Sequence, residues 1–194
     1  MAMGIINKDL LPGNDCFGCG HDNAAGLKIE VFRDPENSNQ LLGRFQTSRK
    51  TIGFPGITHG GAIYTAMDCL ASWVPTILRS EIKAAWVLRS ANIKYLRPAR
   101  EGIQISLSGS IVQEGKKGKP LVVQIRACNA KGDRLAEGQF KVVPLSMERF
   151  KEIAGIDQLP ENWKVLLSDG EPPPLSRDPV YPVDSLENVT EGRD

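Results

Sequence analysis

Residues 56–73 read "GITHGGAIYTAMDCLASW" and are apolar or small at nearly every position. From residue 60 to about residue 79, apolar side chains surround most of a helical circumference, which is typical of a buried helix. One carboxylate, Asp68, lies in the middle of this stretch. Because ionised carboxylates are seldom buried without a partner, the position of Asp68 needs either a structural or a chemical explanation.

Six further segments alternate apolar and polar residues, as strands with one buried face do. They lie at residues 27–34, 40–47, 84–98, 102–114, 120–130 and 134–144. Short connections, among them "AREG", "GKKGK" and "KGD", indicate hairpin turns and therefore an antiparallel sheet. The sequence thus predicts an α+β fold with one long central helix. Since a sheet covers only one side of that helix, we expect a second subunit to cover part of the other side.

The pattern changes at both ends of this region. Residues 1–25 form a polar, turn-rich N-terminal segment, and residues 26–145 form the predicted domain. Residues 146–194 form a C-terminal extension whose first part suits a short helix or two. From about residue 170 this extension is rich in proline and acidic residues, so we expect it to end in a flexible tail.

The composition is that of an ordinary globular protein. Of the 194 residues, 41% are hydrophobic and 24% are charged, and the formal net charge is +1. This charge predicts neither nucleic acid nor an anionic membrane as a partner. We expect a cytoplasmic location, because no apolar run spans a bilayer and the first residues lack the features of a signal peptide. The four cysteines are too few for a disulfide scaffold, so we expect them to be reduced.

The order of the predicted elements, together with one motif, resembles the hotdog-fold acyl-CoA thioesterases. The motif G-x-x-H-G-G-x-x-x-x-x-x-D is typical of the phenylacetyl-CoA type, and it is matched here by Gly56, His59, Gly60, Gly61 and Asp68. "IKYLRPAREG" at 93–102 and "CFGCGHDNAAGLKI" at 16–29 are also similar to segments of this superfamily. The resemblance implies a hotdog fold, in which an antiparallel sheet wraps around the long helix. It also implies hydrolysis of acyl-CoA to free acid and CoA, without a cofactor or a metal.

The resemblance also implies roles for the motif residues. Thioester hydrolysis needs a group that stabilises charge on the carbonyl oxygen and a base or nucleophile on the other side of the carbon. The N–H of Gly60, at a helix N-terminus, would polarise the carbonyl, and His59 would help to shape that site. Gly61 would allow the substrate to approach the backbone closely. Asp68 would activate water as a general base or attack directly as a nucleophile.

The spacing of Gly60 and Asp68 makes a prediction about assembly. Eight residues correspond to about 12 Å along a helix. A reacting carbonyl needs its oxyanion donor and its base each within about 3 Å, so one helix cannot supply both. Two antiparallel helices related by a two-fold axis can supply both. We therefore expect a homodimer, or a dimer of dimers, with active sites shared between subunits.

Two positions depart from the family pattern. Many relatives carry an asparagine where this chain has Gly53, and a serine or threonine where it has Leu88. We expect Ser90 to share a strand face with Leu88 and to replace that hydroxyl in part. These departures favour slow turnover, another substrate class, or a binding protein derived from an enzyme.

Basic residues near the predicted site suit the phosphates of coenzyme A. Arg97 lies at the end of the first strand after the helix, Arg100 lies in the connection that follows, and lysines are frequent in the connection at 115–119. Solvated hairpin tips are often basic as well, so a purely structural interpretation of the lysines and of both arginines remains open.

Other interpretations also remain open. Asp68 would be a structural hydrogen-bond acceptor, His59 a capping histidine, and the glycine pair Gly60 and Gly61 a tight entrance to the helix. Two other functions fit the same motif: a hotdog hydratase or dehydratase, and a non-catalytic acyl-CoA-binding protein. "GFPGI" at 53–57 is similar to a segment of the hydratase branch, which carries a histidine in place of Gly53.

The stretch "CFGCGH" contains three possible zinc ligands, Cys16, Cys19 and His21. A structural zinc site needs four ligands, and the sequence contains no second C-x-x-C pair. We therefore expect a structural turn with reduced thiols here, with zinc as the alternative.

Overall fold

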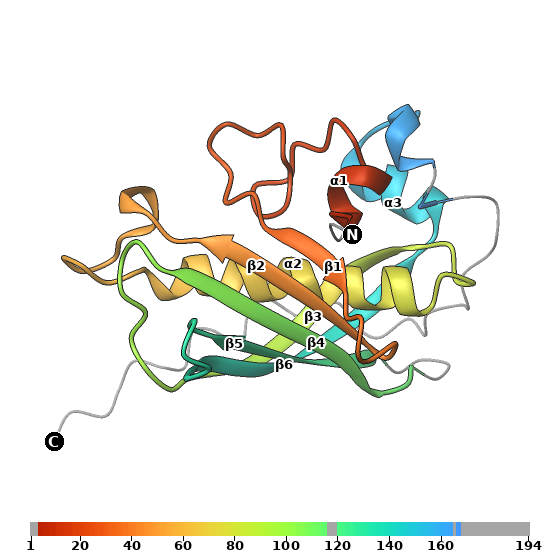
Figure 1. The fold of residues 1–194 in the computed structure, drawn as a ribbon. Helices are drawn as coiled ribbons and strands as arrows, with labels where there is room; N and C mark the ends of the chain where they lie inside the picture. The colour runs from red at the N-terminus through yellow and green to blue at the C-terminus, as the bar shows by residue number, and fades with distance from the viewer. Residues whose placement is uncertain (1–3, 116–119, 165, 168–194) are drawn as a thin grey trace, which may run out of the picture.

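The structure, a computed structural model, describes residues 4–115, 120–164 and 166–167. A six-stranded antiparallel sheet curves around one long helix, and two small helices lie on the side of that helix away from the sheet (Figure 1). The helices are α1 (Ile6–Leu10), α2 (Gly60–Leu78) and α3 (Met147–Ala154). The strands are β1 (Glu30–Arg33), β2 (Gln40–Gln46), β3 (Ala85–Tyr95), β4 (Gln104–Gln113), β5 (Leu121–Cys128) and β6 (Arg134–Leu145). The predicted α+β hotdog fold is confirmed.

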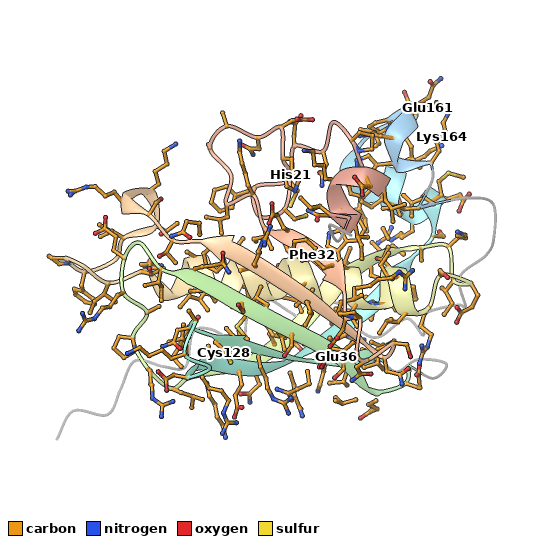
Figure 2. All side chains as sticks on the ribbon, viewed as in Figure 1. His21, Phe32, Glu36, Cys128, Glu161 and Lys164 are labelled. Carbon is orange, nitrogen blue, oxygen red and sulfur yellow. The ribbon has the colours of Figure 1, made fainter. Side chains whose placement is uncertain are left out.

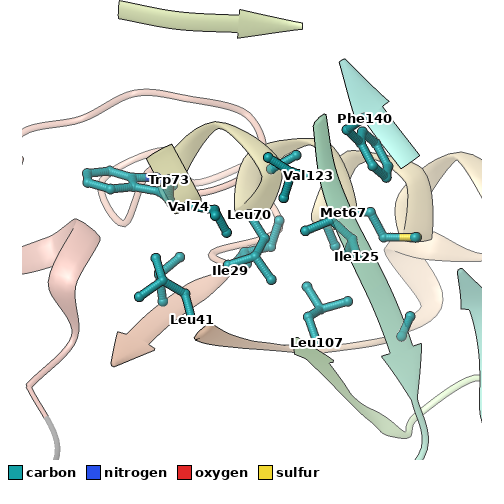
Figure 3. Close-up of a cluster of buried hydrophobic side chains, with 14 of the residues drawn as sticks. Ile29, Leu41, Met67, Leu70, Trp73, Val74, Leu107, Val123, Ile125 and Phe140 are labelled. Atoms are coloured by element: carbon teal, nitrogen blue, oxygen red, sulfur yellow. The ribbon is translucent and has the colours of Figure 1, made fainter. Parts of the chain in front are cut away.

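Helix α2 is the centre of the core, as its apolar sequence predicts. It contacts β2, β3, β4, β5 and β6. Met67, Leu70 and Val74 are fully buried and lie against side chains of β4 and β5 (Figure 3). On the usual scale, full burial of one such side chain contributes roughly 1.5–3 kcal/mol. The sheet and α2 therefore stabilise each other as a single unit, which holds the start of α2 in place.

The strand order is β1-β2-β4-β5-β6-β3. The predicted hairpins β1–β2, β4–β5 and β5–β6 are confirmed by antiparallel pairing. The prediction that "AREG" closes a hairpin between β3 and β4 is wrong, because β3 pairs with β6 at the opposite edge of the sheet. The connection instead passes the start of α2, where the N–H of Thr58 donates to the carbonyl of Ala99.

The N-terminal segment lies on the side of α2 that faces away from the sheet. Gly18 packs so closely on α2 that a β-carbon there would lie 2.2 Å from the Cys69 sulfur. The buried Asn7 amide donates to the carbonyls of Cys19 and Ile29, which holds α1 against this segment. The expectation that a single chain leaves this side of the helix uncovered is therefore wrong for the middle of α2.

The first part of the C-terminal extension is helical, as predicted. In α3, the Phe150 ring stacks on Trp163 with ring centroids 5.6 Å apart. The Asn162 amide donates to the carbonyl of Pro12, which joins the extension to the N-terminal segment. The predicted acidic tail lies outside the described residues. Within the described part of the chain, no helix is both long enough and apolar enough to cross a membrane.

Candidate active site at the start of the central helix

His59 is the N-cap of α2. Its Nδ1 accepts a hydrogen bond of 2.8 Å from the N–H of Gly61, so this nitrogen carries no proton. A β-carbon on residue 61 would lie 2.8 Å from the same Nδ1, so glycine is needed for the cap to form. The interpretation of His59 as a capping histidine is confirmed. The glycine at position 61 leaves room for the imidazole.

Tyr95, at the end of β3, fixes the first residue of the helix. Its hydroxyl donates to the carbonyl of Gly60 at 3.0 Å, and a β-carbon on Gly60 would lie 3.3 Å from its ring. In the part of the chain that the structure describes, the Gly60 N–H meets no acceptor, as is usual in a first helical turn. This role of Tyr95 could not be predicted from the sequence, because nothing local links a strand tyrosine to a glycine 35 residues earlier.

A cavity of about 670 Å³ opens at this helix start. Apolar side chains make up much of its lining, including Phe54 and Ile63, and Gly60 and His59 also reach it. Gly53 belongs to the wall as well, and a β-carbon there would lie 3.1 Å from the His59 ring. The volume is in the usual range for small-molecule sites, about 300–1,000 Å³.

Asp68 lies two turns further along α2 and lines a different cavity, of about 240 Å³. Burial raises the pKa of its carboxyl, and negative charge on Cys16 adds to the rise. Within the described part of the chain, this carboxylate accepts no hydrogen bond. Among the described residues, no hydrogen bond therefore supports the interpretation of Asp68 as a structural hydrogen-bond acceptor.

Tyr64 lies on the helix between the two ends of the predicted site. Burial raises the pKa of its hydroxyl, and the charges of Asp68 and Tyr95 raise it further. Both groups are thus close enough to Tyr64 to affect its titration. Gly60, Tyr64 and Asp68 are spaced four residues apart, so they follow one face of α2.

The structure corrects the predicted relation between Leu88 and Ser90. A β-bulge interrupts the pairing of β3 with β6, so Leu88 lies opposite Val142 and Ser90 lies opposite Lys141. Val142 is buried in the core, whereas Lys141 is exposed. Leu88 therefore points toward the core and Ser90 points to the outer face. The expectation that they share a face is wrong, and Ser90 does not replace the family hydroxyl at position 88.

The two predicted arginines lie in different surroundings. Arg97 lines the cavity at the helix start, and its guanidinium donates to the carbonyl of Arg134. Arg100 does not line that cavity, and its carbonyl accepts hydrogen bonds from the Thr47 and Thr58 hydroxyls. Residues 116–119 of the lysine-rich connection lie outside the described residues.

A family model described as "Thioesterase superfamily" matches residues 55–136, from the loop before α2 into β6. The matched segment includes the whole of α2 and lies within the antiparallel sheet that surrounds it. The match to this family model supports thioester hydrolysis in general as the class of reaction.

Solved structures of hotdog proteins share the architecture of this domain. A thioesterase from Haemophilus influenzae aligns with a TM-score of 0.55 and 19% identity, over 66% of this chain and 86% of that chain. The E. coli PaaI protein from the phenylacetic acid degradation operon aligns with a TM-score of 0.53 and 17% identity, over 62% of this chain and 81% of that chain. At such identities the likeness concerns the fold.

One curated protein matches this chain at a higher sequence identity than these two structures do. Methylthioribose-1-phosphate isomerase from Aquifex aeolicus (strain VF5) is 28% identical over 146 residues. The match includes 72% of this chain but only 29% of the isomerase, so the chain spans less than a third of that protein's length.

Proposed function

We propose that this protein hydrolyses acyl-CoA thioesters to free acid and CoA, using Gly60 of one subunit and Asp68 of another. One observation carries the proposal. A capped helix start presents an unpaired Gly60 N–H to an apolar cavity, and a carboxylate without a hydrogen-bond partner follows on the same helix face.

The helix start supplies the electrostatic part of the reaction. The N–H of Gly60 and the positive end of the α2 dipole favour negative charge on the thioester oxygen. His59 Nδ1 is occupied by the Gly61 N–H, so His59 positions the turn and does not act as a base through that nitrogen. Tyr95 holds the Gly60 peptide from the other side through its carbonyl.

Asp68 supplies the base. As water attacks the carbonyl carbon, the Asp68 carboxylate takes one proton from it. The negative charge passes to the carbonyl oxygen, and the collapse of this tetrahedral species breaks the C–S bond. CoA leaves as the thiolate and takes up a proton to form the free thiol. Direct attack by the carboxylate, followed by hydrolysis of the anhydride, uses the same geometry.

The separation of the two groups supports a shared site. Gly60 and Asp68 line separate cavities of one chain and lie on one continuous helix. Strand β3 is an edge strand, paired only with β6 in the described residues, so its free edge is available for a second copy. Next to this edge, Tyr95 and Phe54 are 53% and 75% exposed. A two-fold contact here would bring one subunit's helix start toward its partner's helix.

A thiol-release assay on a panel of acyl-CoAs tests the proposed reaction. We expect hydrolysis by the wild-type protein and a roughly hundredfold or greater loss of turnover in Asp68→Asn, as removal of a general base causes. Asp133→Asn, in the turn between β5 and β6, is the matched control and should keep full activity. Equal rates for Asp68→Asn and wild type would refute the assignment of Asp68.

A non-catalytic acyl-CoA-binding protein is the second candidate, and Gly53 and Leu88 favour it. Gly53 brings no polar side chain to the cavity, and Leu88 packs into the core instead of holding a water molecule. Saturable binding of acyl-CoA without any thiol release would favour this candidate. Hydration of an enoyl-CoA without thiol release would instead identify a hydratase.

A further inference from the structure

Three cysteines from two distant parts of the chain meet beside α2. Cys16 and Cys19 come from the N-terminal segment, and Cys69 comes from the helix. Their sulfur atoms all lie within 4.8 Å of one another, and the sulfurs of Cys16 and Cys69 are 3.9 Å apart. A tetrahedral zinc ion with Zn–S bonds of about 2.3 Å holds its sulfur ligands about 3.8 Å apart. The cluster is therefore close to the dimensions of a zinc site.

The turn that carries Cys16 and Cys19 is built around their sulfur atoms. The Asn14 side-chain amide donates to the Cys19 sulfur at 3.8 Å. The Trp73 indole N–H, from α2, donates to the Cys19 sulfur at 3.4 Å. Donors of this kind surround metal-bound thiolates and orient them.

Glycine at positions 18 and 20 makes this arrangement possible. A β-carbon on Gly18 would lie 2.2 Å from the Cys69 sulfur and would displace that sulfur from the other two. A β-carbon on Gly20 would lie 2.2 Å from the Asn14 carbonyl oxygen and 2.5 Å from the Cys16 nitrogen. Gly18 therefore allows the turn to approach the helix closely, and Gly20 allows the turn itself to close.

The three thiols also share a cavity that leaves room for a fourth ligand. Cys16, Cys19 and Cys69 line the cavity of about 240 Å³ together with Asp68. Three protein ligands and one open position on a cavity are a recognised zinc arrangement. His21 lies outside the three-thiol group, so the ligand set differs from the one that the sequence suggested.

We propose that Cys16, Cys19 and Cys69 bind one Zn²⁺ ion, with a solvent molecule as the fourth ligand. Thiolate sulfur suits zinc, and each thiol releases its proton to solvent as the ion binds. The ion joins the N-terminal segment to the middle of α2, one residue from Asp68. This proposal does not rest on the proposed hydrolysis, since metal binding is measured without any substrate.

The experiment uses the full chain, purified under reducing conditions and dialysed against a zinc buffer. Metal content is measured by plasma mass spectrometry, and Co²⁺ is titrated into the metal-free protein while its absorption is recorded. We expect about one zinc per chain and an intense thiolate-to-cobalt charge-transfer band typical of tetrahedral sulfur ligation. Cys16→Ser, Cys19→Ser and Cys69→Ser should each lower the bound zinc at least about tenfold.

Cys128→Ser is the matched control. Cys128 ends β5 on the sheet, well away from the N-terminal segment that contains His21 (Figure 2). This variant should bind zinc and cobalt like the wild type. Circular dichroism checks that each variant is folded, and the cobalt spectrum of the wild type tests the proposal even if one variant does not fold.

Several results would overturn the proposal. One is a wild-type protein that binds no more zinc than a Cys16→Ser, Cys69→Ser double variant. Another is unchanged binding in folded Cys69→Ser, and a third is a cobalt spectrum without the charge-transfer band. A mass two hydrogens below that of the reduced chain, persisting under reducing conditions, would show that two of these thiols form a disulfide instead.

Discussion

Complementation between two inactive variants would show whether the active site is shared. One variant is Asp68→Asn, which removes the proposed base. The other is Gly60→Pro, which removes the N–H proposed to polarise the carbonyl. Proline suits the first turn of a helix, and the preceding His59 has φ −62° and ψ 134°, a conformation that proline tolerates in its neighbour.

Proline also adds a β-carbon, which would lie 3.3 Å from the Tyr95 ring. Gly60→Ala adds the same carbon but keeps the N–H, so it is the matched control. The difference in activity between Gly60→Ala and Gly60→Pro then isolates the N–H from the crowding against Tyr95. We expect Gly60→Ala to keep much more activity than Gly60→Pro, with similar unfolding midpoints for both.

The expected recovery follows from two-fold symmetry. Random exchange of equal amounts makes about half of the dimers mixed. In a mixed dimer, one site combines both lesions and the other combines the intact Gly60 with the intact Asp68. One working site in half of the dimers gives about one quarter of wild-type activity, starting from two preparations that are nearly inactive.

The assay is thiol release with the best acyl-CoA, before and after exchange. Exchange is verified by native mass spectrometry with one variant isotopically labelled. If mixed dimers form, both variants are folded and no activity returns, the shared site is refuted. Asp68 would then have to act with an oxyanion donor from its own chain.

Three further predictions concern the helix start and the C-terminal tail. Tyr95→Phe removes the hydrogen bond to the Gly60 carbonyl, so it should lower kcat/KM several-fold and lower the free energy of unfolding in urea by about 1 kcal/mol or less. An unchanged kcat/KM would contradict the positioning role of Tyr95. Gly61→Ala places a β-carbon against His59 Nδ1 and disrupts the cap, so the free energy of unfolding should fall by about 1–2 kcal/mol in the same assay. A chain ending at Gly170 should fold and hydrolyse substrate normally, because the remaining residues are too polar and proline-rich to bury much surface; a large loss of solubility or activity would show that the tail docks on the domain.

The helix and strand segments and the start of the central helix follow from local patterns in the sequence. Period-two alternation and the apolar run from residue 60 depend on which neighbouring residues face the core, so they are readable without any long-range contact. The predicted helix ends within one residue of α2 (Gly60–Leu78), and all six predicted strands are present. His59, Gly60 and Gly61 could be placed at the helix start for the same reason, since a cap is formed by residues close in sequence.

Contacts between distant segments are visible only in the folded chain. β3 leaves its sequence neighbour β4 and pairs with β6 at the far edge of the sheet. One bulge in that pairing turns Ser90 away from the face of Leu88, and no local sequence pattern predicts this bulge. Cys69 joins Cys16 only where the N-terminal segment packs on the helix, 53 residues apart in sequence. Such contacts depend on register and packing between elements, which are set by burial of the whole core rather than by the residues on either side.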